Sequence, residues 1–112
     1  MVPEITVAEL SEKLTSQDQF ILLDVREPHE LNAARLTDSR LKVLPLSRLA
    51  REGPKALSEL TKDAPIYVIC HHGNRSGQVT AWLAQQGWKN VFNVRGGIDE
   101  YAREIDQSVG FY

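Results

Sequence analysis

The chain has one cysteine, Cys70, and its neighbours favour chemistry at the sulfur. Cys70 follows the apolar run 66–69, which is typical of a strand, and precedes a polar loop and a helix expected from Ser76. Backbone amides at a helix start have no intrahelical partner and carry the positive end of the dipole, so they favour a thiolate. Gly73 lets the loop bend so that its amides converge, and Arg75 adds a permanent positive charge. We therefore expect Cys70 to be a nucleophile.

Short apolar segments alternate with helical segments, and this alternation predicts the fold class. Strands are expected over residues 20–25, 41–46, 66–69 and 90–94. Helices are expected over 6–14 behind a Thr6–Glu9 capping box, and over 29–36, 47–60 with a break at 53–54, 76–86 and 98–105. Such a pattern is typical of an α/β fold with an open parallel sheet and helices on both faces. Ligands of these sheets bind beyond the carboxyl ends of the strands, where Cys70 lies.

Length and composition limit the class of protein. The 112 residues are close to the commonest domain size, so we expect one domain over residues 1–112. Hydrophobic residues make up 42% and the net charge is −2, which is ordinary for a globular protein and gives no basic surface for nucleic acid. No apolar run approaches the roughly 20 residues that cross a bilayer, and the first residues do not resemble a signal peptide. We expect a cytoplasmic protein with no membrane partner.

Four segments, in order, resemble the rhodanese family. They are residues 22–28, the loop 70–76, residues 87–94 and the double-glycine turn 95–97. The resemblance implies a rhodanese-like three-layer fold and a sulfurtransferase that moves a sulfane sulfur from thiosulfate or a persulfide to cyanide or a thiol. The sulfur would be carried as a persulfide on Cys70, without a cofactor. The partners would be a small-molecule donor and acceptor, and a sulfur-accepting protein is a further candidate.

The expected site is centred on the loop. Cys70 is its nucleophile, and the expected substrate-binding residues are His71, His72, Gly73, Asn74, Arg75 and Ser76. Asp24 and Arg26 close an apolar strand and are expected to support the loop, with a structural role for Asp24 favoured over a catalytic one. Adjacent histidines rarely converge on one ion, so no metal is predicted. Whether His71 and His72 polarise the donor, supply a proton or are simply exposed stays open.

Two places depart from the family pattern. Residues 34–39 read Ala-Arg-Leu-Thr-Asp-Ser where many members carry Gly-His-Ile-Pro-Gly-Ala, and Tyr101 stands where the family has a tryptophan after the double glycine. Neither change touches Cys70 or Arg75. Because of these two departures, the resemblance does not predict the shape of the pocket or the surface that binds a partner.

Two other functions fit parts of the same evidence. A cysteine phosphatase or arsenate reductase also sets a thiolate and an arginine at a helix start, but those enzymes place one more residue between the two than the four found here. A non-catalytic binding module could keep the fold without the chemistry. The intact Cys70, Gly73 and Arg75 argue against that alternative.

Overall fold

The computed structural model describes residues 2–112, and its centre is one five-stranded sheet. The strands are β1 (Glu4–Ile5), β2 (Ile21–Asp24), β3 (Leu41–Val43), β4 (Ile66–Ile69) and β5 (Val91–Val94). Their spatial order is β1-β5-β4-β2-β3, and every neighbouring pair is parallel. β4 is buried along its whole length between β2 and β5. The carboxyl ends of all strands therefore meet at one edge, and the residue after β4 is Cys70.

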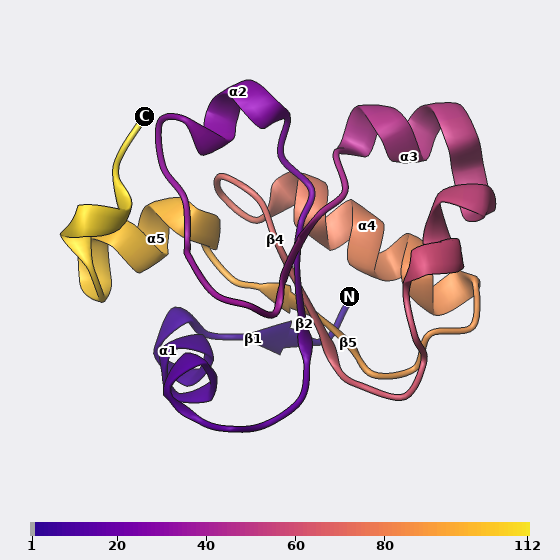
Figure 1. The fold of residues 1–112 in the computed structure, drawn as a ribbon, viewed down its shortest axis with the longest axis horizontal. Coiled ribbons are helices and arrows are strands. Elements are labelled where there is room, and N and C mark those ends of the chain that lie inside the picture. Colours follow the sequence, from indigo (N-terminus) through magenta and orange to yellow (C-terminus); the bar gives the residue numbers. More distant parts are fainter. Residues whose placement is uncertain (1) are drawn as a thin grey trace.

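Helices cover both faces of the sheet, as the alternation predicts (Figure 1). They are α1 (Val7–Thr15), α2 (Pro28–Leu31), α3 (Leu46–Glu52), α4 (Asn74–Gln85) and α5 (Gly97–Glu104), with 3-10 turns η1 (Gly53–Glu59) and η2 (Gln107–Val109). Successive strand residues face opposite sides, so Leu23 and Val68 pack in a core with α3, η1 and α4. Leu22 and Tyr67 pack in a second core with α1 and α5. None of the helices in residues 2–112 is long and apolar enough to cross a membrane.

Most of the predicted elements are confirmed, and the differences have local causes. The helix expected from Ser76 begins two residues earlier, at Asn74, because Gly73 adopts the left-handed conformation (φ 103°) that starts it. The strand expected over 41–46 is wrong at its end: it stops at Val43, and Pro45 is the N-cap of α3 in place of the expected cap at residue 47. The two-residue β1 was not predicted, because so short a strand shows no apolar period.

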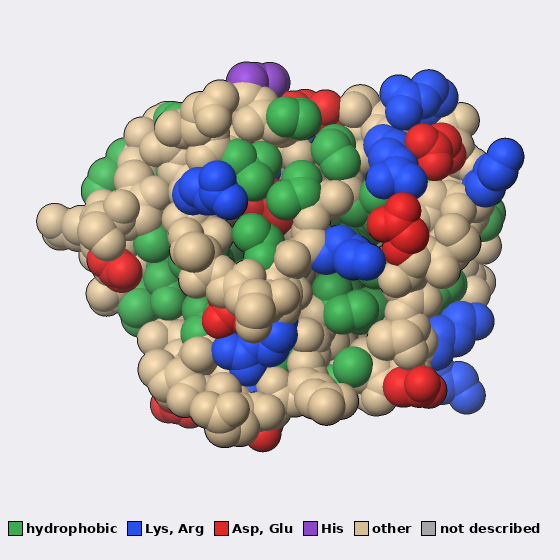
Figure 2. All heavy atoms as spheres, in the orientation of Figure 1, with side chains coloured by type: hydrophobic (Ala, Val, Ile, Leu, Met, Phe, Trp, Pro, Cys, Tyr) green, Lys and Arg blue, Asp and Glu red, His purple; other side chains and the backbone are tan. Residues whose placement is uncertain are grey.

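The surface over α3 and η1 has no single sign of charge. Arg48 bonds to Glu52 and Glu59, and Arg51 also contacts Glu52. Figure 2 shows basic and acidic side chains side by side on this part of the visible face. Such interspersed charges make an ordinary solvated surface and give no continuous basic track for a phosphate backbone.

Candidate active site

The loop after β4 encloses the sulfur of Cys70. The thiol side chain is 1% exposed. Its Sγ accepts hydrogen bonds from the Gly73 amide at 3.1 Å, the Ser76 amide at 3.3 Å and the Ser76 hydroxyl at 3.2 Å. Hydrogen bonds to an ionised group are stronger than those to a neutral one, so the two backbone amides, helped by a hydroxyl whose proton is shared with Asn93, suit an anionic sulfur at this point. The amides converge on the sulfur atom itself.

Asn93, on β5, holds this loop at Gly73 and at Ser76. Its side chain is 5% exposed, its amide nitrogen donates to the Gly73 carbonyl at 3.1 Å, and its oxygen accepts from the Ser76 hydroxyl. That hydroxyl has one proton and two acceptors, Asn93 Oδ1 and the sulfur of Cys70. Sequence reasoning missed Asn93, although an amide inside the apolar run 91–94 is a signal that could have found it.

The double-glycine turn closes the other side of the loop. The amides of Ile98 and Asp99, at the start of α5, donate to the carbonyls of Cys70 (2.9 Å) and His71 (3.0 Å). A Cβ at Gly97 would lie 2.5 Å from the Cys70 carbonyl oxygen and 2.4 Å from that of His71, closer than atoms can approach. Only glycine therefore lets α5 begin against the active loop.

Arg75 leaves the loop and pairs with Glu30 of α2. Its Nη1 and Nη2 lie 2.8 Å from the two carboxylate oxygens of Glu30, which is a bidentate pair. Glu30 is 8% exposed and also accepts from the amide of Glu27 at 2.8 Å and the hydroxyl of Tyr112 at 2.9 Å. The sequence predicted Arg75 as a positive charge beside the sulfur. The sequence did not predict that Glu30 would neutralise this charge.

Asp24 and Arg26 form a buried pair behind Glu30. The Arg26 guanidinium donates to both oxygens of Asp24, at 3.0 Å from Nε and 2.8 Å from Nη2. Its Nη1 donates to the Glu30 carbonyl at 3.3 Å and to the Tyr112 hydroxyl at 3.2 Å. Their hydrogen bonds thus reach α2 and Tyr112, and a supporting role for Asp24 and Arg26 stays a prediction.

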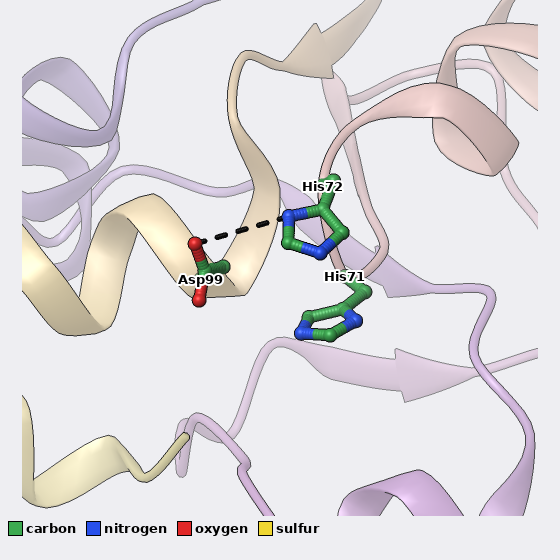
Figure 3. Close-up of side chains that lie close together, drawn as sticks. All are labelled: His71, His72 and Asp99. Carbon is green, nitrogen blue, oxygen red and sulfur yellow. Dashed lines mark ion pairs between the residues drawn. The ribbon is translucent and has the colours of Figure 1, made fainter. Parts of the chain in front are cut away.

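The two histidines of the loop lie in a stack of rings with Tyr112. The His71 ring lies between the rings of His72 and Tyr112, at centroid distances of 3.9 Å and 3.8 Å. Burial lowers the pKa of His71, which favours its neutral form. The exposed His72 points its Nδ1 toward Asp99 Oδ2 at 3.8 Å (Figure 3). That oxygen also accepts from Arg103 at 2.9 Å.

The remaining predicted positions lie apart from the sulfur. Asn74 is exposed at the first turn of α4. Tyr101, the replacement for a tryptophan, is buried in the core of α1 and α5. In the atypical segment 34–39, the Arg35 amide donates to the Val109 carbonyl at 3.1 Å, and this bond leads the chain toward Tyr112. The segment 34–39 therefore binds the last residues of the chain, which carry Tyr112 to Glu30 and Arg26.

Comparison with known proteins identifies the family of this chain. The sequence model of the family described as Rhodanese-like domain matches residues 6–104. A protein of Allochromatium vinosum named "Sulfurtransferase" is 37% identical over 103 residues, covering 92% of this chain and 91% of that protein. The chloroplastic Rhodanese-like/PpiC domain-containing protein 12 of Arabidopsis thaliana is 39% identical over 114 residues, but this chain spans only 38% of its length.

The solved structures give the same result for the fold. The crystal structure of a rhodanese-related protein from Thermoplasma volcanium superposes with a TM-score of 0.75 and 36% identity, covering 92% of this chain and 93% of that one. The family match extends over all five helices and four of the five strands described above. This chain belongs to the rhodanese-like domain family.

Proposed function

We propose that this protein is a sulfurtransferase that carries sulfur as a persulfide on Cys70, from thiosulfate or a persulfide donor to a thiol or cyanide. The observation that carries the proposal is the convergence of the Gly73 and Ser76 amides on Sγ, with the Ser76 hydroxyl as a further donor that Sγ shares with Asn93. These donors favour a thiolate, and together they form a small anion-binding nest. Membership of the family and the sulfurtransferase relative support the same class of reaction.

The first half-reaction forms one sulfur–sulfur bond and breaks another. The Cys70 thiolate attacks the outer sulfur of a persulfide R–S–SH, the original S–S bond breaks, and R–S⁻ leaves with the bonding pair. The product is Cys70–S–SH. With thiosulfate the leaving group is sulfite. Loop amides aimed at the sulfur stabilise charge there before and after the transfer without reorganising.

The second half-reaction returns the thiolate. A thiol or cyanide nucleophile attacks the outer sulfur of the persulfide, and Cys70 leaves as the thiolate. Because the 112 residues contain no second cysteine, no thiol of this chain can displace the sulfur as an internal disulfide. The acceptor is therefore a separate molecule, either a small nucleophile or a sulfur-accepting protein.

The loop geometry favours sulfur over phosphate ester chemistry. Only four residues separate Cys70 from Arg75, and the two nearest amides already donate to the sulfur. Nη1 and Nη2 of Arg75 are each bonded to Glu30, whose carboxylate would repel a phosphate oxyanion bound beside it. The compact cradle suits one sulfur atom better than a tetrahedral group.

Intact-mass measurement tests the proposal. Incubation with thiosulfate or an amino-acid persulfide, followed by removal of the donor, is expected to add one sulfur atom that dithiothreitol or cyanide removes. Cys70→Ser, which differs by one atom in a buried side chain, is the control and is expected to stay unmodified and inactive. An unchanged mass with both donors would exclude the persulfide carrier, and transfer by the serine variant would exclude Cys70.

A further inference from the structure

The charge beside the active sulfur is compensated by Glu30. The two ends of the Arg75 guanidinium face the two oxygens of that carboxylate at 2.8 Å. The pair uses two of the five N–H donors of the guanidinium, and the carboxylate balances its charge, so Arg75 attracts an incoming oxyanion less strongly than a free guanidinium would. The side chain of Arg75 is 32% exposed and that of Glu30 is 10% exposed, so the pair reaches the surface at the edge of the loop.

Glu30 is held in place by more than Arg75. The amide of Glu27 and the hydroxyl of Tyr112 each donate to one of its oxygens. The hydrogen bonds from Arg75 hold the carboxyl pKa at about 2, so Glu30 is ionised at any pH at which the protein works. A carboxylate that is charged, nearly buried and anchored on two further donors does not swing away freely.

Other charged groups around the loop are also paired. Arg26 is bonded to Asp24, and Asp99 is bonded to Arg103 and lies near His72. Both of these basic residues thus have an acidic neighbour. The attraction for an anion comes mainly from the loop amides and the start of α4, and these already act on the sulfur of Cys70.

We infer that Glu30 is a specificity-determining residue which, by neutralising Arg75, selects sulfur donors of low net negative charge. This inference rests on the proposed function of Cys70 and names its donor class. An amino-acid persulfide, whose amine and carboxylate cancel, fits the neutral rim. Thiosulfate carries two negative charges, and the Arg75 charge that would attract them is already balanced by Glu30.

Alkylation of Cys70 measures this selectivity without any sulfur transfer. Iodoacetate and iodoacetamide differ in charge and hardly in size, and Cys70 is the only thiol that can react. Glu30→Gln leaves Arg75 uncompensated and is expected to raise the iodoacetate-to-iodoacetamide rate ratio about fivefold. Arg75→Gln leaves Glu30 uncompensated and is expected to lower that ratio by a similar factor. The double variant Glu30→Gln/Arg75→Gln is expected to return close to the wild-type ratio.

The control is Glu27→Gln, which also removes one negative charge, at the N-cap of α2, three residues before Glu30. The Glu27 carboxylate bonds to Ser47 rather than to Arg75, so the ratio is expected to change less than about twofold. An unchanged ratio in Glu30→Gln, or the same change in both glutamate variants, would overturn the inference. If Glu30→Gln does not fold, the comparison of Arg75→Gln with the double variant decides, and equal ratios in those two would overturn it.

Donor kinetics complete the test. The wild type is expected to use cysteine persulfide with a kcat/KM at least about tenfold above that for thiosulfate, and Glu30→Gln is expected to narrow the gap through the KM for thiosulfate. A wild type that prefers thiosulfate would overturn the inference while leaving the proposed function intact. Absence of transfer from either donor would reject the proposed function, and the alkylation ratios would still report on Glu30.

Discussion

The phenol ring of Tyr112 lies flat on the imidazole ring of His71, with 3.8 Å between centroids and 8° between planes. The same residue donates its hydroxyl to Glu30 and accepts from Arg26. It reaches this position because the Val109 carbonyl is bonded to the Arg35 amide and Gly110, with φ 108°, packs against the carbonyl of residue 33. The Tyr112 side chain thus connects His71 of the active loop with Glu30 and with the buried pair of Asp24 and Arg26.

Separating the ring of Tyr112 from its hydroxyl tests both contacts. Tyr112→Phe keeps the stack but leaves Arg26 and Glu30 short of one partner, so we expect a loss of about 1 kcal/mol in the free energy of unfolding. Tyr112→Leu also removes the stack and should cost about 0.5–1.5 kcal/mol more. Urea denaturation measures both. Phe111→Leu is the matched control, since Phe111 is exposed to nearly the same extent as Tyr112 (47% and 43%) and takes no part in the stack with His71, and a loss there as large as in Tyr112→Leu would contradict this account.

Asn93 offers a second test, on the shape of the loop. Asn93→Ala removes the buried donor to Gly73 and the acceptor of the Ser76 hydroxyl, and the donors to Cys70 are then free to spread. We expect a loss of about 1–3 kcal/mol in stability and a fall of at least about tenfold in sulfur transfer. Asn90→Ala, at the exposed start of the same segment, is the control. Equal activities in the two folded variants would show that Asn93 does not shape the site.

The separation of residues along the chain explains what the sequence could and could not predict. β4 and α4 were predicted within two residues because their patterns are local: a fully apolar run, then apolar residues three and four apart ended by Gly87. Cys70 and its loop were found from the same local pattern. The capping box of Thr6 and Glu9 was likewise readable within one turn.

The missed residues reach the site from far away in sequence. Glu30 is 45 residues from Arg75, Tyr112 is 82 from Glu30, and Asn93 is 17 from Ser76. No periodicity links such positions, because the parallel sheet and its crossovers bring them together. The neutralisation of Arg75 by Glu30 therefore depends on the tertiary structure, and the donor preference proposed here could not be inferred from the loop alone.

Acid denaturation should report on Glu30 directly. Its folded pKa of about 2 lies below the usual 4.5, chiefly because Arg75 donates to it. A lowered pKa adds stability above the unfolded value, and that stability is lost as the pH falls through the folded one. We expect the wild type to lose on the order of 2–3 kcal/mol from this group between about pH 5 and pH 2, a loss absent from Glu30→Gln.

Urea denaturation at several pH values across that range gives the comparison, and other carboxylates cancel in the difference between the two proteins. Glu52→Gln is the control, because Glu52 pairs with Arg48 on the surface, where salt and water screen the charges. Its profile should stay close to that of the wild type. Parallel profiles for the wild type and Glu30→Gln would show that the ion pair with Arg75 does not contribute to acid stability.

The length of the active loop gives the last prediction. One glycine inserted between Gly73 and Asn74 separates the Gly73 amide from the Ser76 amide and hydroxyl, which now act on one sulfur from the two sides of that point. The wider ring no longer converges on Cys70, so we expect sulfur transfer to fall at least about tenfold, equivalent to about 1.4 kcal/mol of transition-state stabilisation. Phosphate and arsenate should inhibit the variant more strongly, because a wider nest of amides fits a tetrahedral oxyanion.

A glycine inserted between Asp63 and Ala64, in the exposed turn before β4, is the matched control and should leave transfer unchanged. Ester hydrolysis need not appear in the active-loop variant, since it also requires a general acid for the leaving group. The comparison therefore uses thiosulfate:cyanide transfer, persulfide formation by mass and inhibition by phosphate in the two folded insertion proteins. If the active-loop insertion keeps both the transfer rate and the phosphate affinity of the wild type, the spacing of Cys70 and Arg75 does not choose between sulfur and phosphorus chemistry.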